Sequence, residues 1–164
     1  MAKTKPTQNA TFEVSLKVIL KNKKGEILLL KNPEYSSMPG YCDLIGGRIQ
    51  NKEILSPFKK ILTREIKEEL GGKVKYKLSE IPVSIGRHYY FSKSEQKTVY
   101  IFWVFFEAIY KEGEIKISKE HVGYDWVKLN KRNLKKYFIK GPLEGMRNYL
   151  FQKFTSALWE LNIL

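Results

Sequence analysis

The longest apolar run in the chain, VYIFWVFFEAIY at residues 99–110, most restricts what the sequence can fold into. A membrane-spanning helix needs about 20 apolar residues, so this run is too short to cross a bilayer, and it also contains Glu107. β-Branched and aromatic residues, which favour extended backbone, dominate it. The run therefore predicts a buried β-strand rather than a membrane segment.

The composition is that of one folded unit. The chain has 164 residues, of which 43% are hydrophobic, enough for a packed core. We expect a flexible tail at residues 1–10 and a single domain over residues 11–164. One cysteine, Cys42, excludes an internal disulfide and favours a reducing compartment. Because the N-terminus also lacks the apolar core of a signal peptide, we expect a cytoplasmic protein with no membrane partner.

The charge is strongly positive. Lys and Arg number 30 against 17 Asp and Glu, which gives a formal net charge of +13. Such a charge attracts polyanions, among them nucleotides and nucleic acid, or it serves only solubility. The basic residues are spread along the chain, and only residues 131–140 form a dense cluster. A dedicated nucleic-acid-binding tract is therefore not indicated, although RNA is a possible partner.

Alternating apolar patterns and turn residues predict the remaining elements. Residues 11–22 and 26–32 read as a β-hairpin. Further strands are predicted at 41–47, at 73–91 as one strand or two with a bend near Pro82 or Gly86, at 114–118 and at 124–130. A C-terminal helix follows from the helical spacing of Met146, Leu150, Phe154, Ala157, Leu158 and Leu161. The order of elements predicts the α+β class.

The central helix is predicted after the short strand 41–47. Ser56 is a good N-cap, Pro57 suits the first helical position, and Gly71 or Gly72 suits the end. With Phe58 set at zero and about 100° per residue, the helix has one apolar stripe. Its members are Ile61, Leu62, Ile66 and Leu70.

Acidic residues lie inside that apolar stripe. Glu65 and Glu69 fall at about 340° and about 20°, and Glu68 lies at its margin near about 280°. Burying an unpaired carboxylate costs several kcal/mol or more, so a cation must meet these acids. Two cations would serve: Arg or Lys side chains from the sheet, or a divalent metal. Oxygen ligands at this spacing suit Mg²⁺, with Mn²⁺ possible.

The glycines before the helix complete a motif. The order Gly46-Gly47, Glu53, then REIKEELG at 64–71 resembles the signature of the Nudix hydrolases. Gly47 and Glu53 have the family's five-residue spacing, whereas ten residues instead of seven separate Glu53 from Arg64. A reading without insertion would place Gln50 and Ser56 at the Gly and Glu positions. We favour the insertion, because Gly46-Gly47 then ends a predicted strand.

Two further positions depart from the family pattern. Its final aliphatic position is Gly72, and the proline often found before the two glycines is Ile45. The resemblance covers roughly residues 11–130. It implies an α/β/α sandwich in which the motif helix lies on one side of a mixed sheet and the C-terminal helix packs on that sheet.

The resemblance also implies an activity. Nudix hydrolases cleave the phosphoanhydride of a nucleoside diphosphate linked to another group, with in-line attack of water at phosphorus. By resemblance, the metal ligands are expected to be Glu65, Glu69, Glu68 and the Gly47 carbonyl, with Arg64 orienting the acids by charge-assisted hydrogen bonds. The general base varies within the family, and the candidates here are Glu68 and Glu120. We expect His121 to be a structural or surface residue.

Substrate contacts are less constrained. Gly46, Gly47 and Arg48 are candidates beside the phosphates, together with Arg87 and Lys97. Tyr89 is a candidate for stacking on a base, as are Tyr90, Phe91 and Trp126. Two alternatives to a small-nucleotide hydrolase remain open: an RNA 5′-end pyrophosphohydrolase and a non-catalytic domain that only binds nucleotide or nucleic acid. The sequence is compatible with a monomer or a homodimer.

Overall fold

The computed structural model describes the backbone of residues 9–160 and the side chains of residues 9–153. The strands are β1 (Glu13–Lys21), β2 (Ile27–Lys31), β3 (Cys42–Asp43), β4 (Lys75–Ser92), β5 (Lys97–Glu112) and β6 (Gly123–Val127). The helices are the 3₁₀ turn η1 (Asn51–Glu53), α1 (Phe58–Leu70), α2 (Leu134–Tyr137) and α3 (Lys140–Glu160). The α+β class is confirmed.

The sheet is mixed. Its order is β3-β2-β1-β5-β4. β6 lies outside this order and also pairs with β2. β1 runs parallel to β5, whereas the other strand pairs are antiparallel. β1 and β2 are paired only at Lys21 and Ile27, beside the turn that joins them. The edge of β1 beyond that point is taken by the segment around the two glycines, with the Leu16 amide 2.9 Å from the Gly47 carbonyl.

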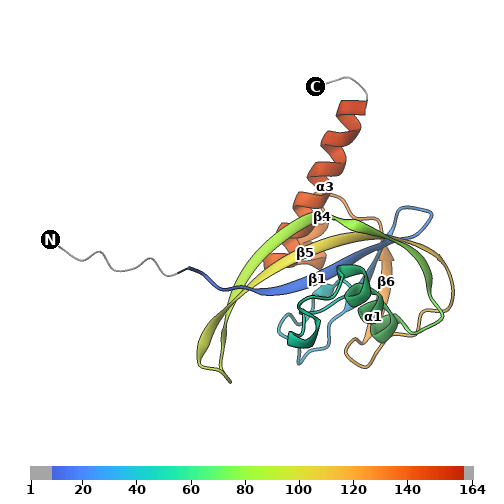
Figure 1. The fold of residues 1–164 in the computed structure, drawn as a ribbon. Coiled ribbons are helices and arrows are strands. Elements are labelled where there is room, and N and C mark those ends of the chain that lie inside the picture. Colours follow the sequence, from blue (N-terminus) through green and yellow to red (C-terminus); the bar gives the residue numbers. More distant parts are fainter. Residues whose placement is uncertain (1–8, 161–164) are drawn as a thin grey trace.

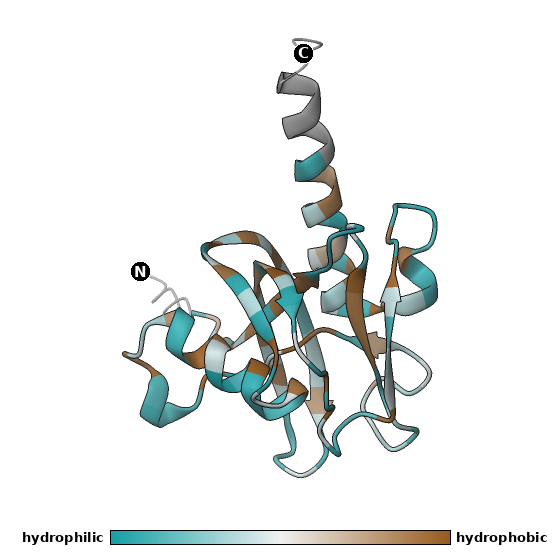
Figure 2. Ribbon diagram, turned by 90° about the vertical axis from the view of Figure 1, so that its right-hand side faces the viewer, coloured by the Kyte–Doolittle hydropathy of each residue, from teal (hydrophilic) through white to brown (hydrophobic). Residues whose placement is uncertain are grey.

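Helices cover both faces of the sheet, with α1 on one side and α3 on the other (Figure 1). Neighbouring residues of β5 therefore enter different cores, since Phe106 packs in the core that contains the α1 residues and Phe105 in the core that contains residues of α2 and α3. Both phenylalanines are fully buried. The prediction of a buried strand at residues 99–110 is confirmed. Hydrophobic stretches follow the strands, and hydrophilic residues occupy the turns (Figure 2).

The predicted strand at 73–91 is one long strand, β4, with register shifts on both sides of Pro82. The bend expected near Pro82 is thus present, because proline has no amide hydrogen to donate to the ladder. The predicted strand at 114–118 is wrong. Its amides pair with a helix end instead: Lys116 N lies 2.9 Å from the Leu70 carbonyl, and Ser118 N lies 2.9 Å from the Glu69 carbonyl.

The two main helices differ slightly from expectation. Pro57, not Ser56, occupies the N-cap position of α1, and Gly71 ends the helix with φ of +83°. In α3, Met146 and Tyr149 are buried against the sheet, while Leu150 is half-buried. The expected core positions Phe154, Ala157, Leu158 and Leu161 lie outside the residues whose side chains are described. Among the described helices, none is long and apolar enough to cross a membrane.

Candidate active site

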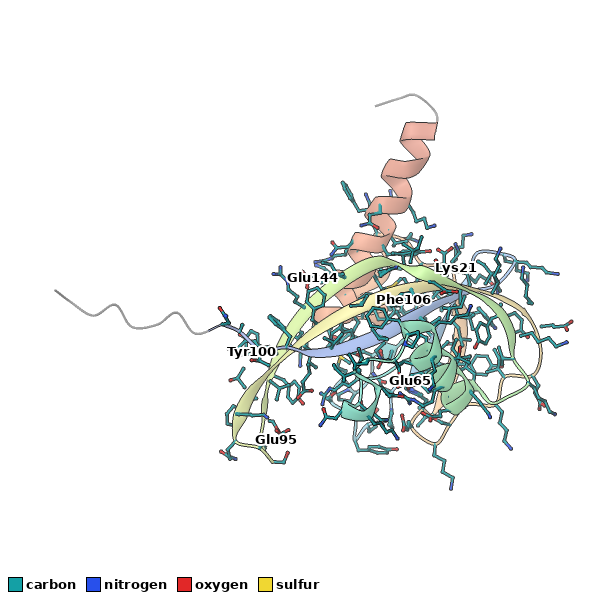
Figure 3. The ribbon with its side chains drawn as sticks, viewed as in Figure 1. Lys21, Glu65, Glu95, Tyr100, Phe106 and Glu144 are labelled. Carbon is teal, nitrogen blue, oxygen red and sulfur yellow. The ribbon has the colours of Figure 1, made fainter. Side chains whose placement is uncertain are left out.

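The acids of α1 lie where the helical wheel places them. Glu65 and Glu69 are 8% and 7% exposed, on the face that packs on the sheet, whereas Glu68 is exposed. In Figure 3, Glu65 lies at α1, far from the β4–β5 hairpin tip that carries Glu95. Two carboxylates one helical turn apart thus share a nearly buried surface.

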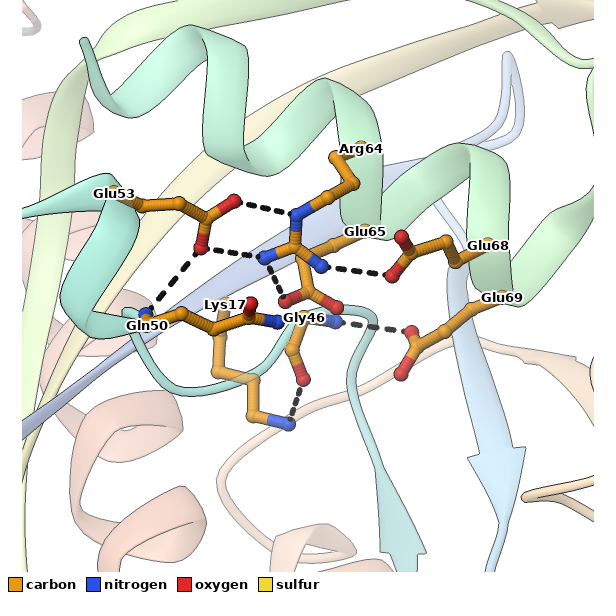
Figure 4. A network of polar contacts seen from close by, with 8 residues as sticks. All are labelled: Lys17, Gly46, Gln50, Glu53, Arg64, Glu65, Glu68 and Glu69. Carbon is orange, nitrogen blue, oxygen red and sulfur yellow. Dashed lines mark hydrogen bonds and ion pairs between the residues drawn. The ribbon is translucent and has the colours of Figure 1, made fainter. Parts of the chain in front are cut away.

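Arg64 is the cation that meets three of the acids (Figure 4). Its guanidinium donates to both oxygens of Glu53 at 2.7 and 2.9 Å, to Glu65 at 2.8 Å and to Glu68 at 2.7 Å. Such charge-assisted bonds fix the directions of the carboxylates, because guanidinium is planar and its donors have fixed angles. Arg64 therefore holds Glu65 and Glu68 in defined orientations.

The three extra residues between Glu53 and Arg64 lengthen a solvent-exposed connection between η1 and α1. Glu53 ends the short turn η1, and the chain then passes through Ile54 and Leu55, which are strongly exposed, before α1 begins. The insertion widens this exposed connection and leaves the Glu53–Arg64 contact intact. An interpretation with Ser56 at the position of Glu53 has no such ion pair to support it.

The two glycines are required by close approaches. Gly46 has φ of +122°, and a Cβ there would lie 2.1 Å from the Leu16 carbonyl oxygen. A Cβ on Gly47 would lie 2.8 Å from Glu65 Oε1. The Gly46 amide also donates to Glu69 Oε2 at 3.0 Å, and its carbonyl accepts from Lys17 Nζ at 2.7 Å. The glycine segment thus contacts both buried acids of α1.

A loop brings two more ligand-type side chains to the end of α1. Glu120 and His121 follow the residues whose amides bind the last carbonyls of the helix. One ligand atom each from Glu69, Glu120 and His121 lie within 4.8 Å of one another. The Glu120 carboxylate is exposed and has no ion pair or hydrogen bond among residues 9–153. The loop predicted to carry a base therefore does reach the acids of α1.

A pocket of about 500 Å³ opens beside the glycine segment. It is built from β1, β4, β5 and the start of α3, with Gly47 and Arg48 on its wall. The remaining lining residues are Ser15, Lys17, Ser37, Met38, Asp43, His88, Tyr90, Ile101, Trp103, Lys140 and Pro142. Two buried polar atoms in this lining, His88 Nε2 and Trp103 Nε1, have no hydrogen-bond partner among the described residues.

The predicted substrate contacts divide between pocket and surface. Arg48 reaches the pocket, where Nη2 donates to the Tyr90 hydroxyl at 2.9 Å and Nε pairs with Glu13 at 3.0 Å. Tyr89 points to the opposite face of β4, is 64% exposed and packs near Tyr100. The stacking role expected for Tyr89 thus lacks support from the pocket geometry, because alternate residues of a strand face opposite sides.

Sequence reasoning missed Lys17, His88 and Trp103 as pocket residues. Lys17 is 4% exposed and pairs with Asp43 at 2.9 Å, which orders the chain before the glycines. A lysine at a buried position of an apolar strand was the signal that could have revealed it. His88 and Trp103 come from two strands far apart in sequence from the glycines, so only the fold brings them together.

Burial and ion pairs shift several pKa values here. Burial raises the pKa of Glu65, although Arg64 opposes this effect, and Glu69 and Glu68 add to it. The hydrogen bond from Arg64 lowers the pKa of Glu53, and the pairing with Glu53 raises the pKa of Arg64. In the pocket, burial and the nearby Lys140 lower the pKa of His88. His88 is therefore neutral near pH 7.

The donor set fits a divalent cation. Carboxylate oxygens of Glu65 and Glu69 lie against the glycine segment, and Glu120 lies near Glu69. Arg64 is the only Arg or Lys among the described residues that forms an ion pair with Glu65 or Glu68, and none does so with Glu69 or Glu120. One guanidinium does not balance this many carboxylates. The Gly47 carbonyl accepts from the Leu16 amide, which leaves one of its lone pairs for another partner.

The family model of the NUDIX domain matches residues 11–144. This chain belongs to the Nudix family. The expected resemblance is thereby confirmed. No curated protein matched it.

Solved structures show the same fold. A MutT protein from Methanosarcina mazei Go1 is 27% identical, with 92% of this chain and 98% of that one covered and a TM-score of 0.59. An Ap4A hydrolase from C. elegans is 18% identical, with coverages of 90% and 98% and a TM-score of 0.56. An ADP-ribose pyrophosphatase from Streptococcus suis 89-1591 is 16% identical, with coverages of 87% and 92% and a TM-score of 0.55. The last two similarities concern the fold alone.

Proposed function

We propose that this Nudix protein hydrolyses the phosphoanhydride of a nucleoside diphosphate linked to another group, with Mg²⁺ as the cofactor. The carrying observation is the pair of nearly buried carboxylates, Glu65 and Glu69, one turn apart on α1. Among residues 9–153, Glu65 has only Arg64 as an ion-pair partner, and Glu69 has only the His121 ring, at 3.7 Å. A helix face built only for packing would not carry two such acids.

A divalent cation bound at these acids would neutralise charge on the phosphate oxygens that flank the attacked phosphorus. Glu65, Glu69 and Glu68 would hold it, together with the Gly47 carbonyl. Arg64 holds the carboxylates of Glu65 and Glu68 in defined orientations. The site is thus arranged before substrate binds, which avoids reorganisation during the reaction.

Among the two candidate bases, the contacts favour Glu120. Glu68 already accepts a hydrogen bond from Arg64 at 2.7 Å, so its carboxylate is engaged in holding the site together. Glu120 has no such partner among residues 9–153 and lies within reach of Glu69. We propose that Glu120 accepts the proton of the attacking water, as a carboxylate on a loop beside the acids can do.

The pocket beside Gly47 and Arg48 is the proposed seat of the nucleoside. Rings and apolar side chains line it together with charged and hydroxyl groups, and the Trp103 indole N–H and neutral His88 offer hydrogen bonds that the described residues leave unmade. Arg48 lies in the pocket lining, where its guanidinium would bind a phosphate of the substrate. We propose that a small nucleotide binds in this pocket. We also propose that the protein is cytoplasmic.

The test is turnover of a panel with MgCl₂: canonical and oxidised dNTPs, ADP-ribose, NADH, dinucleoside polyphosphates and 5′-triphosphorylated RNA. Reaction in ¹⁸O-labelled water locates the attacked phosphorus. We expect Mg²⁺-dependent cleavage of at least one nucleotide and a loss of at least about 100-fold in Glu69→Gln, as for loss of a direct metal ligand. Glu95→Gln, at the distant hairpin tip, is the matched control.

Equal turnover in Glu69→Gln would overturn the metal assignment. Tight nucleotide binding without cleavage of any panel member would overturn the catalytic proposal and favour a binding module. Cleavage restricted to triphosphorylated RNA would replace the small nucleotide by an RNA 5′ end.

A further inference from the structure

The side chain of His121 is deeply buried without a hydrogen bond. It is 7% exposed, and neither Nδ1 nor Nε2 has a hydrogen-bond partner among the described residues. Leaving a buried polar group unpaired costs about 1–3 kcal/mol, and a neutral imidazole has one donor and one acceptor to satisfy. A buried histidine with two unsatisfied nitrogens therefore needs an explanation.

Acidic ligands surround the imidazole. Nε2 lies 3.7 Å from Glu69 Oε1, too long for a hydrogen bond. The carboxylate of Glu120 completes a group of three ligand atoms that all lie within 4.8 Å of one another. Ligand atoms about 2.1 Å from one octahedral ion are separated by about 3.0 to 4.2 Å. The group therefore needs only a small contraction to surround one ion.

The backbone fixes the positions of these side chains. Ser118 N donates to the Glu69 carbonyl at 2.9 Å, and His121 N donates to the Ser118 carbonyl at 3.4 Å. The Glu120 amide donates to Ser118 Oγ at 3.3 Å. The loop is thus bonded to the residue that supplies the third ligand, so main-chain hydrogen bonds hold the backbones of the three donor residues close together.

We propose that His121 is a nitrogen ligand, with Glu69 Oε1 and one oxygen of Glu120, for a first-row divalent transition metal such as Mn²⁺. Imidazole is a borderline-soft donor that suits transition metals, whereas Mg²⁺ prefers oxygen ligands and water. The biological use of this metal site rests on the proposed function. Its test does not, because the experiment detects the nitrogen ligand directly.

The test is pulsed electron paramagnetic resonance of the full chain loaded with MnCl₂. We expect ¹⁴N modulation from one imidazole, replaced by ¹⁵N modulation when histidine alone is ¹⁵N-labelled, which needs no variant. The chain has two histidines, so His88→Gln should keep the modulation and His121→Gln should lose it. By calorimetry, His121→Gln should weaken Mn²⁺ binding about 10- to 100-fold and Mg²⁺ binding less than about threefold.

Mn²⁺ binding without histidine nitrogen modulation in the wild type would overturn the inference and leave the hydrolase proposal intact. Modulation that survives in His121→Gln but disappears in His88→Gln would overturn it equally. Histidine modulation in a protein that cleaves no member of the panel would instead support the metal site and defeat the hydrolase proposal. Circular dichroism of His121→Gln verifies that the variant is folded.

Discussion

Arg64 and Glu53 form a two-point ion pair, with Nε 2.7 Å from Oε1 and Nη2 2.9 Å from Oε2. The same guanidinium also reaches Glu65 and Glu68, so Glu53 holds the group that orients both acids. The pair connects the turn η1 to the helix α1 across the exposed insertion. Glu53 is therefore a positioning residue in the proposed site.

Replacing Glu53 by Gln should lower kcat/KM about 10- to 100-fold with little change in fold, because a partner behind the ligands is lost. The steady-state rate of the best panel substrate measures this. Glu80→Gln is the matched control, since Glu80 of β4 forms an exposed ion pair with Lys59 of α1 at 2.7 Å. A loss of equal size in Glu80→Gln would contradict the positioning role.

The two glycines should respond differently to alanine. Gly46→Ala places a Cβ 2.1 Å from a backbone carbonyl at φ of +122°, so we expect a loss of about 3 kcal/mol or more in unfolding free energy. In Gly47→Ala the close atom is the end of the Glu65 side chain, which can turn away. That variant should fold but bind Mg²⁺ weakly. Urea unfolding and metal titration separate the two effects, and similar stabilities for both variants would contradict this account.

Metal addition should stabilise the wild type and not Glu69→Gln. A ligand present at about 100 times its Kd raises the unfolding free energy by about 2.7 kcal/mol. Without metal, Glu69→Gln should be as stable as the wild type or more so, because an amide can still accept from the Gly46 amide and removes one of the neighbouring buried charges. Thermal unfolding with and without MgCl₂ checks both statements. An unchanged metal increment in the variant would refute the ligand role.

A second buried polar pair makes stability depend on pH. Burial opposes ionisation of Glu107, but the Tyr149 hydroxyl and the charges of Lys21 and Lys153 prevail and lower its pKa below 4.5. A lowered folded pKa gives stability that is complete above the unfolded value and is lost as pH falls through the folded value. Stability should therefore decline as pH falls through the acid range below the ordinary pKa of a glutamate.

Tyr149→Phe removes the hydroxyl donor, so the pKa of Glu107 should rise toward its ordinary value. We expect a loss of about 2 kcal/mol near pH 7 and a smaller dependence of stability on pH between about pH 3 and 5. Urea unfolding across this range measures both quantities. A variant whose pH dependence matches the wild type would show that the hydroxyl does not set the titration of Glu107.

The pocket should lose affinity when its free indole N–H is removed. Trp103→Phe should raise KM about three- to tenfold, the equivalent of one hydrogen bond, with kcat changed less, because the group lies away from the acids of α1. Phe151→Leu, on the exposed part of α3, is a control outside the pocket. A fall in kcat with constant KM would contradict a role in nucleoside binding.

Local periodicity was enough to place the acids. The apolar stripe of α1 positioned Glu65 and Glu69 on the buried face because a helix repeats its geometry from residue to residue. The strand at residues 99–110 was equally predictable, since a run of twelve mostly apolar, β-branched and aromatic residues favours a buried strand. These features depend on contacts within a short segment.

Features formed by segments far apart in the chain could not be predicted from the sequence. The segment 114–118 has a strand-like pattern, but its amides bind the end of α1, a partner that lies more than forty residues earlier in the chain. His121 was expected to be structural or on the surface, because no sequence pattern shows that its ring is buried against Glu69. The pocket, assembled from several strands and α3, likewise exists only in the fold.

The main-chain hydrogen bonds from residues 116 and 118 to the last carbonyls of α1 have a consequence for how the sequence of this loop can evolve. Since amides and not side chains attach this loop, residues 119–122 can be exchanged without detaching it from the helix. Different donors can thus be presented to the same three acids of α1. If the proposed metal site holds, substitution at Glu120 or His121 alone should change the metal preference while the Nudix scaffold stays the same.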